Sequence, residues 1–466
     1  MSHSATDTVR SAFRMLAAVA FVSTGATLSA CDDDDNGLEP GEPTEAAFTL
    51  RIENVGEMHE VLKSGSFDTP VGASAPAALL PGDAYEVDLT APPGAHFSFA
   101  TMFIPSNDFF FAPDEDGIPL YDANGDPVDG VVTSQIMLWD AGTEENQEPG
   151  LGDDQAPSQG DPDTGASDPD ISVRPAADDF GNLPDVEDVI EVMVQHDSAQ
   201  RFTVIIQNVS DSTTLMTSDG GRQAVPLSPG AWVLHTESAP LFTAGDPLED
   251  DGLEAIAEDG DPATLADNLE ERSGVTVPLS PGVWAVYQGD NPVFTVGSAD
   301  ADDGLEAVAE DGDPTALAAA LGAATDVDAS GTFTMPEGSA TAGPIGPGEA
   351  YEIQFTAMEG DRLSFATMFV ASNDLFYGPE DGIALFNGDV PANGDLTAQV
   401  GLWDAGTEVN QEPGVGPDQV QRQDGPDSGE DEDGIIRAIA DVEDGYFYPP
   451  VGDIIRVTIV STPIVN

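Results

Sequence analysis

The stretch LWDAGTE at residues 138–144 decides how this chain of 466 residues is organised, because the same letters return at residues 402–408, 264 residues later. The segment FATMF also occurs twice, at residues 99–103 and 365–369, with an offset of 266 residues. Chance does not place two such matches in the same order at nearly the same distance. The chain therefore contains two copies of one module.

The boundaries of the two copies follow from their opening segments. Residues 48–55 and 202–209 share a strand-like pattern, but they lie only 154 residues apart. The second copy is therefore expected to carry an insert between its first and second strands, at residues 226–324. We predict one domain over residues 46–199 and a second over residues 200–466.

The insert is itself a tandem repeat. The tetrad LSPG at residues 227–230 returns 52 residues later at 279–282. Each unit is expected to begin with a strand and to end in a short helix that packs on the sandwich. Asp261 and Asp313 each cap such a helix, since each precedes a proline that suits the first helical position.

The rest of the chain has the pattern of β structure. Apolar residues alternate with polar ones in short runs, such as residues 48–55 and 454–459, and turn dipeptides such as Asp116-Gly117 and Pro347-Gly348 separate the runs. The fold class predicted is all-β, with two tandem antiparallel β-sandwiches.

The charge balance restricts the function. The chain has 87 acidic residues against 12 basic ones, for a formal net charge of −75. Nucleic acids and anionic membrane surfaces are excluded as partners, because phosphate groups are bound by clusters of lysine and arginine. An acidic surface of this density is typical of a salt-adapted organism, since self-repulsion is screened at high ionic strength; an ordinary acidic secreted protein is the alternative.

The N-terminal residues predict export. Residues 1–31 combine Arg10 and Arg14 with an apolar stretch and the tetrad LSAC, which ends at Cys31 and resembles a bacterial lipobox. We expect Cys31, the one cysteine of the chain, to be acylated, and residues 32–45 to form an acidic tether. The protein would then be lipid-anchored at the membrane or envelope, facing outside the cytoplasm. A cleaved signal peptide with an incidental cysteine is the alternative.

The duplicated motifs resemble those of the spondin domain. The segment WDAGTE at residues 139–144, with its partner at 403–408, is similar to the Trp-Asp-Ala-Gly-Thr-Asp segment of that family. Residues 97–108, which end in PSND, are similar to its Ser-Pro-Ser-Pro-Asp segment. The resemblance implies a C2-like β-sandwich, a bound calcium ion and an adhesive or matrix role, with an extracellular glycan, matrix component or surface protein as partner.

The residues by themselves also permit a metal there. Calcium takes six to eight oxygen ligands, and a turn around Gly142 can bring the carboxylates of Asp140 and Glu144 to one ion. Asp108 would supply a third ligand from another strand end. The predicted calcium ligands of both copies are Asp108, Asp140, Glu144, Asp374, Asp404 and Glu408. The alternative is that these acids belong only to the acidic surface.

Signatures of catalysis are weak. None of the five histidines recurs in both copies, and no nucleophile elbow or phosphate-binding glycine loop occurs. The chain is therefore predicted not to be an enzyme but a calcium-binding adhesion module. A calcium-dependent extracellular hydrolase and a structural envelope lipoprotein without a specific ligand are the alternatives. Residues 109–111 and 375–377, which are rich in aromatic side chains, could form a binding rim or belong to the core.

Overall fold

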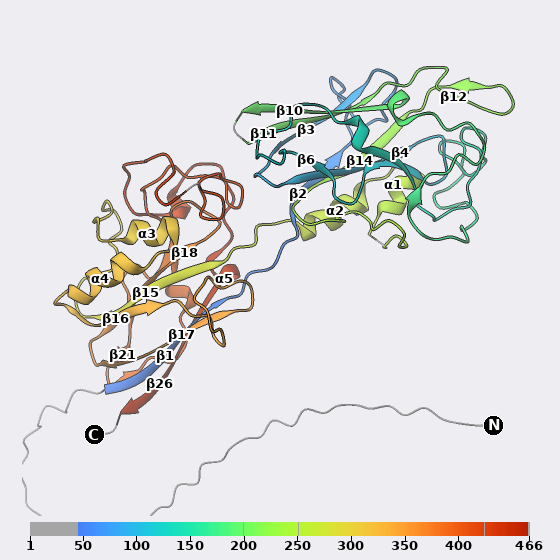
Figure 1. Cartoon of the computed structure of the whole chain (residues 1–466). Coiled ribbons are helices and arrows are strands. Elements are labelled where there is room, and N and C mark those ends of the chain that lie inside the picture. The colour runs from blue at the N-terminus through green and yellow to red at the C-terminus, as the bar shows by residue number, and fades with distance from the viewer. Residues whose placement is uncertain (1–44, 199, 250, 424, 465–466) are drawn as a thin grey trace, which may run out of the picture. The chain divides into compact units, whose positions relative to one another are not determined.

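The computed structural model describes residues 45–464, except residues 199, 250 and 424. Its secondary structure is mostly antiparallel β (Figure 1), so the predicted all-β sandwich class is confirmed. The predicted signal peptide, Cys31 and residues 32–44 of the tether lie outside the described residues. Among the described residues, no helix is long and apolar enough to cross a membrane.

Residues 61–272 form what we call the central lobe, a name that refers to its place in the sequence. Its smaller sheet has the strand order β3-β11-β10-β7, and its larger sheet has the order β2-β14-β4-β5-β8-β9, with β6 paired to β4. The strands are β2 (Val61–Phe67), β3 (Ala84–Thr90), β4 (His96–Phe103), β5 (Phe109–Pro113), β6 (Ile118–Pro119), β7 (Gly130–Val131), β8 (Ile136–Asp140), β9 (Arg174–Pro175), β10 (Ile190–Ser198), β11 (Arg201–Asn208) and β14 (Leu227–His235). Side chains from the two sheets, such as Phe97 and Val204, share one hydrophobic core.

Residues 45–54 and 279–464 form what we call the outer lobe. Its smaller sheet has the order β17-β1-β26-β23, and its larger sheet has the order β16-β15-β18-β19-β24-β25, with β20 paired to β18. The strands are β1 (Glu45–Asn54), β15 (Leu279–Tyr287), β16 (Val327–Phe333), β17 (Ala350–Met358), β18 (Arg362–Phe369), β19 (Leu375–Gly378), β20 (Ile383–Ala384), β23 (Gly394–Asp395), β24 (Gly401–Asp404), β25 (Arg437–Ala438) and β26 (Ile455–Ile464). Its core again lies between the two sheets.

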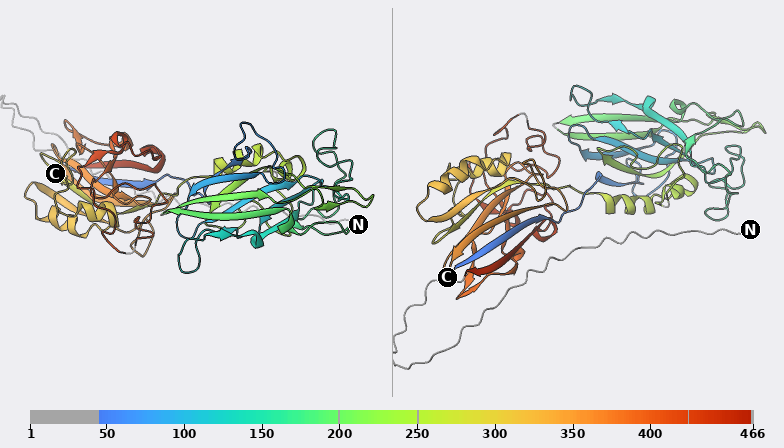
Figure 2. Two further views of the ribbon diagram at one scale, coloured as in Figure 1. Left: turned by 90° about the horizontal axis from the view of Figure 1, so that it is seen from above. Right: turned by 60° about the horizontal axis from the view of Figure 1, so that its bottom comes forward.

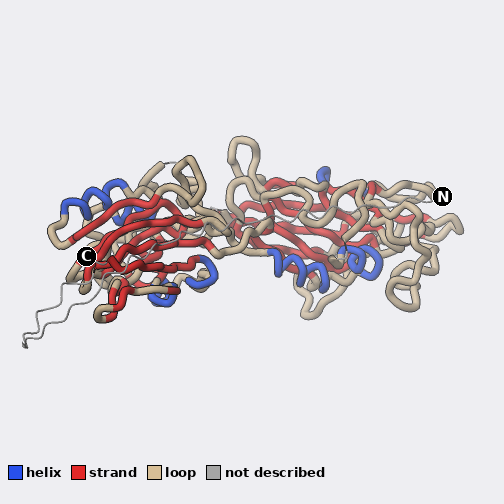
Figure 3. The backbone as a smooth tube through the Cα atoms, turned by 90° about the horizontal axis from the view of Figure 1, so that it is seen from below, coloured by secondary structure: helices blue, strands red, loops and turns tan. Residues whose placement is uncertain are grey.

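Two short helices pack on the larger sheet of each lobe (Figures 2 and 3). They are α1 (Leu253–Asp259) and α2 (Ala263–Arg272) in the central lobe, and α3 (Leu305–Asp311) and α4 (Thr315–Ala323) in the outer lobe. Buried leucines such as Leu265 and Leu317 join each pair to its sheet, so the predicted packing of α2 and α4 is confirmed. The sequence pattern had indicated one helix per unit, and α1 and α3 are additional.

The remaining elements are small. They are the hairpin strands β12 (Leu215–Met216), β13 (Arg222–Gln223), β21 (Phe386–Asn387) and β22 (Val390–Pro391), the one-turn helix α5 (Val451–Ile454), and the 3-10 turns Thr133–Gln135, Val186–Asp188, Thr397–Gln399 and Ile439–Asp441.

Strand pairing does not follow the predicted boundary between residues 199 and 200. β1 pairs with β17 and β26, where Phe48 faces Phe355 and Leu50 faces Ile459. β11, which has the same alternating pattern as β1, pairs instead with β10 and β3. The central lobe is therefore inserted in the sequence of the outer lobe, between β1 and β15.

The insert units are also divided between the lobes. β14, α1 and α2 belong to the central lobe, while β15, α3 and α4 belong to the outer lobe. The expectation that residues 226–324 form a doubled insert in one domain is therefore not met, and the two lobes contain the same parts. The repeated sequence indicates which types of strand are present, but it does not specify which copy of each strand joins which sandwich.

Candidate metal centre

Strand register brings together the first two predicted ligands of each lobe. Asp108 directly precedes β5 and Asp140 ends β8, and the two strands pair so that Phe109 faces Asp140. In the outer lobe Leu375, which follows Asp374, faces Asp404 in the same way. The aspartates therefore lie side by side at one end of each larger sheet.

The turn after β8 folds back onto Asp108 as the spacing predicts. Gly142 has a φ of 70°, and its N–H donates to Asp140 Oδ1 at 2.8 Å. A Cβ at Gly142 would lie 2.7 Å from the carbonyl oxygen of Ser172, so only glycine fits. The next two N–H groups, of Thr143 and Glu144, both donate to Asp108 Oδ2 at 3.2 Å.

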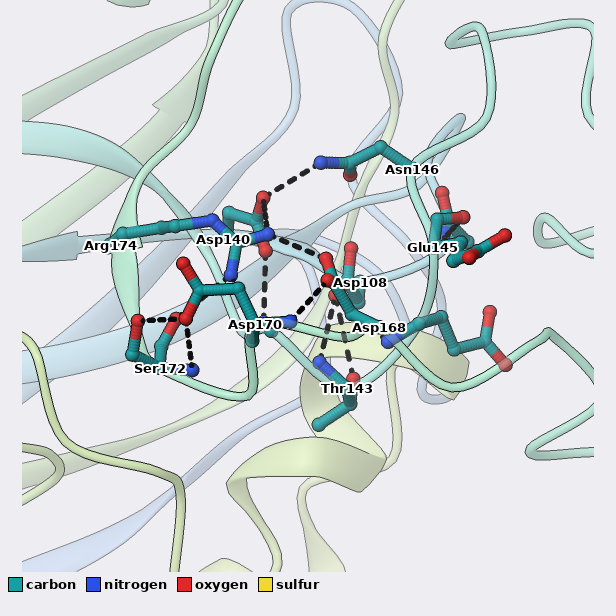
Figure 4. Close-up of polar contacts among 12 residues, drawn as sticks. Asp108, Asp140, Thr143, Glu145, Asn146, Asp168, Asp170, Ser172 and Arg174 are labelled. Carbon is teal, nitrogen blue, oxygen red and sulfur yellow. Dashed lines mark hydrogen bonds and ion pairs between the residues drawn. The ribbon is translucent and has the colours of Figure 1, made fainter.

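Asp140 differs from Asp108 and Glu144, because a basic side chain is bound to it, although burial still raises its pKa. Its Oδ2 accepts hydrogen bonds from Asn146 and from the guanidinium of Arg174, each at 2.8 Å (Figure 4). Arg174 also holds Asp168 at 2.6 Å. The sequence pattern did not single out this arginine, although its counterpart Arg437 lies 263 residues later, close to the offsets of the repeated motifs.

The outer lobe repeats this ion pair. Arg437 contacts Asp404 Oδ2 at 2.9 Å and Glu432 at 2.7 Å. Asp374, Asp404 and Glu432 are close enough for one ion, but the guanidinium is bound to two of them. We therefore regard Asp140 and Asp404 as acids that hold an arginine and the turn, and not as the principal cation ligands.

Asp108 and Asp374 have the opposite character. Both side chains are fully buried, and Oδ1 of each has no hydrogen-bond partner. Burial, with added repulsion from Asp140, raises the pKa of Asp108 to about 7. Burial and Asp404 raise the pKa of Asp374 in the same direction. A buried carboxylate oxygen without a donor needs a proton or a cation.

Glu144 and Glu408 lie at the end of the same turn and are also buried. Glu144 Oε1 accepts the N–H of Gly165 at 2.5 Å, and its Oε2 has no partner. Glu408 Oε1 accepts the N–H of Gly429 at 2.7 Å, while its Oε2 accepts from Asn373 at 3.1 Å. Burial raises the pKa of both glutamates.

Four further acids surround these sites and were missed at the level of sequence. Glu258 of α1 and Asp163 come within 4.8 Å of Glu144, counted between carboxylate oxygens. Glu310 of α3 and Asp427 occupy the matching places in the outer lobe. The repeat offsets of 52 and 264 residues, which relate each pair, are the signal that could have found them.

The aromatic segments after Asp108 and Asp374 form no open rim. The side chains of Phe109, Phe110 and Phe111 are buried, as are those of Leu375, Phe376 and Tyr377. They belong to the core, which was the second of the two possibilities left open by the sequence.

Comparison of the chain with protein-family models and with curated proteins gives no match. The likeness to the spondin domain consequently rests on the quoted motifs.

Proposed function

We propose that this chain is an exported, lipid-anchored calcium-binding protein of the adhesion or matrix type, with a calcium site in each lobe. The observation that carries the proposal is the unpartnered, buried carboxylate oxygen of Asp108, which recurs at Asp374. A cation supplies the missing partner in both lobes.

The chemistry of the surroundings favours calcium among the cations. In the described part of the centre the available donors are the unpartnered carboxylate oxygens of Asp108 and Glu144. Hard oxygen donors in an irregular arrangement suit calcium, whereas zinc is more often held by cysteine and histidine. The Glu in place of the final Asp of the spondin-like motif is compatible with this, since calcium tolerates variable geometry.

Complete burial of Asp108 favours binding over hydrolysis. A general acid must reach the bond that it protonates, and this carboxyl has an exposed fraction of 0%. Its raised pKa therefore fits a cation-binding site better than the active site of a hydrolase that acts on an extracellular polymer. The cation would fix the turn at residues 140–144 against β5 and so hold the loops of a binding surface.

The calcium site is tested by thermal melts of the full chain in concentrated salt, with calcium or with chelator. The double variant Asp108→Asn, Asp374→Asn should lose the response to chelator that the parent shows. Asp116→Asn, Asp381→Asn is the matched control, because these exposed turn residues carry the same charges outside the centre. A parent protein whose melting is identical in calcium and chelator would contradict the proposal.

The membrane anchor is tested separately by cell fractionation. Cys31→Ser should release the protein from the membrane fraction into the soluble or secreted one. Retention of the variant with the membrane would count against acylation, whatever the outcome of the calcium experiment.

A further inference from the structure

The helix that precedes each Gly-Asp-Pro turn directs a glutamate into the protein interior. Glu258 lies near the end of α1 and Glu310 near the end of α3, and both have an exposed fraction of 2%. The two helices occupy equivalent places, because their sequences LEAIAED and LEAVAED are 52 residues apart and pack on corresponding sheets. Each lobe therefore has a buried glutamate on the first of its two short helices, α1 or α3.

Neither glutamate is paired with a basic side chain within the described part of the chain. Oε1 of Glu258 has no hydrogen-bond partner, and neither oxygen of Glu310 has one. The ion pairs of the described residues include no cation bound to either side chain. Burial raises the pKa of each to about 8; the nearby hydroxyls of Thr143 and Thr407 act against this rise, and repulsion from Glu144 and Glu408 adds to it.

The position of each glutamate near the C-terminal end of its helix further disfavours a negative charge on it. The last turn of a helix presents unpaired carbonyl groups, which disfavour a negative charge and favour a positive one. A glutamate at this position is consequently unfavourable unless a cation accompanies it.

A second acid from a loop approaches each buried glutamate. Asp163 joins Glu258 and Glu144 in the central lobe, and Asp427 joins Glu310 and Glu306 in the outer lobe. In each group the ligand oxygens lie within 4.8 Å of one another. Oxygens that share one calcium ion at 2.3 to 2.6 Å can be at most about 5 Å apart, so three acids in each lobe already meet this limit.

The outer site also has a route from solvent. A cavity of about 250 Å³ is lined by Asp302, Glu306, Glu310 and Asp427. Asp300, whose Oδ1 is buried without a partner, forms a further acidic group with Asp302 and Glu306. A hydrated cation can therefore reach Glu310 while it keeps several waters.

We infer that each lobe binds a second divalent cation, held in common by Glu258 and Asp163 in the central lobe and by Glu310 and Asp427 in the outer lobe. Glu144 and Glu306 complete the respective sites. The ligand is a hard cation such as calcium, because all the donors are carboxylate oxygens. Bound there, it would tie the helical layer to the long loop that follows the LWDAGTE turn.

In the central lobe this second site shares Glu144 with the Asp108 site, so the test addresses Glu258, Asp163 and their counterparts, which only the second site uses. It is tested by equilibrium dialysis of the full chain against radioactive calcium in concentrated potassium chloride. Glu258→Gln, Glu310→Gln should bind one calcium fewer per lobe than the parent, or bind it about tenfold or more weakly. The control Asp267→Asn, Asp328→Asn removes the same net charge from exposed positions and should bind as the parent does.

A second variant distinguishes the loss of a calcium ligand from misfolding of the Glu258→Gln, Glu310→Gln protein. Asp163→Asn, Asp427→Asn changes two exposed loop residues with φ near 50°, a conformation that asparagine adopts as readily as aspartate. It should lose the same ions as the glutamate variant. Unchanged calcium stoichiometry and affinity in both variants would overturn the inference and leave Glu258 and Glu310 as neutral, buried acids.

The two proposals fail independently in this experiment. Asp108→Asn, Asp374→Asn should remove only the calcium ions of the first centre. If both centres exist, a protein that also carries Asp163→Asn and Asp427→Asn should lose the ions of both centres. A parent that binds only the ions sensitive to Asp163→Asn, Asp427→Asn would refute the first centre and support the second.

Discussion

Replacement of Asp108 by asparagine should change the stability of the central lobe in opposite directions with and without calcium. Oδ2 of Asp108 accepts two backbone N–H groups, whereas Oδ1 is buried without a partner. Without a cation, the folded lobe must therefore keep a proton on Asp108 or bury its charge. An asparagine at this position needs no proton and buries no charge, because it is neutral at every pH, but it is a weaker ligand for calcium.

The magnitude follows from the displaced pKa. Burial and Asp140 raise the pKa of Asp108 from 3.8 to about 7, and one unit corresponds to about 1.4 kcal/mol. In chelator, ionisation of Asp108 thus lowers the free energy of unfolding by roughly 4 kcal/mol above pH 7. The loss is absent below pH 3.8, where the carboxyl is protonated in both states, and it grows as the pH rises from 3.8 to 7.

Asparagine recovers only part of this energy. Its amide takes the place of an unpartnered oxygen, and an unsatisfied buried polar group costs about 1 to 3 kcal/mol. We expect Asp108→Asn to stabilise the lobe by about 1 to 3 kcal/mol in chelator at pH 8. With calcium at a thousand times its dissociation constant, the parent gains about 4.1 kcal/mol that the variant lacks, and the order of stability reverses.

The assay is urea unfolding at fixed high salt, with and without calcium. Tryptophan fluorescence reports on the central lobe alone when Trp284 and Trp403 of the outer lobe are replaced by phenylalanine, because Trp139 and Trp232 remain. Asp116→Asn is the control and should be neutral in both conditions. A variant that is less stable than the parent in chelator at pH 8 would refute the account of Asp108 as a buried, uncompensated acid.

Three further outcomes are expected. Gly165→Ala should weaken calcium binding and destabilise the central lobe by about 1 to 3 kcal/mol in a denaturation assay, because its Cβ would lie 2.2 Å from the carboxyl group of Glu144. Burial lowers the pKa of His235 to about 4. Because the unfolded chain binds this proton first, the free energy of unfolding of the central lobe should fall by up to about 3 kcal/mol between pH 6.5 and pH 4. His235→Gln should reduce this pH dependence in thermal melts. A fragment of residues 58–274 should unfold cooperatively in urea, whereas residues 46–199 should not.

Each of these expectations has its own control or contrary result. Gly160→Ala serves the first, since a Cβ at Gly160 meets no atom within 4 Å. A pH slope that persists in His235→Gln would assign the acid sensitivity to other groups. Cooperative unfolding of residues 46–199 would mean that β1 can pair with the strands of the first copy, against the register in which Phe48 faces Phe355.

Much of the fold could be predicted from local pattern. The alternation in residues 48–54 appears in the structure as alternate buried and partly exposed side chains of β1, because the side chains of a strand point to opposite faces. The turn at Gly142 was predictable for a similar reason, since the spacing of Asp140 and Glu144 around a glycine restricts the backbone there.

The candidate site was predictable only in part. The duplicated motif placed Asp108 beside the turn at residues 140–144, as the structure has it. Glu258, by contrast, stands in an acidic segment that looks like solvent-exposed surface, and its burial depends on how α1 docks on the sheet. Arg174 was overlooked because its partners Asp140 and Asp168 are brought to it by a strand pair and a loop.

The sequence by itself therefore determined the duplicated module, its β-sandwich class and the acids at the LWDAGTE turn, because repeats, alternation and turn residues are local properties. Only the tertiary structure decided which copy of each strand joins which sandwich: β1 and β11 present the same alternating face, and their long-range partners distinguish them. The same holds for the state of the acids. Asp140 obtains an arginine, whereas Asp108, Glu258 and Glu310 each keep at least one buried carboxylate oxygen without a partner. This difference arises from burial and packing between segments distant in the chain.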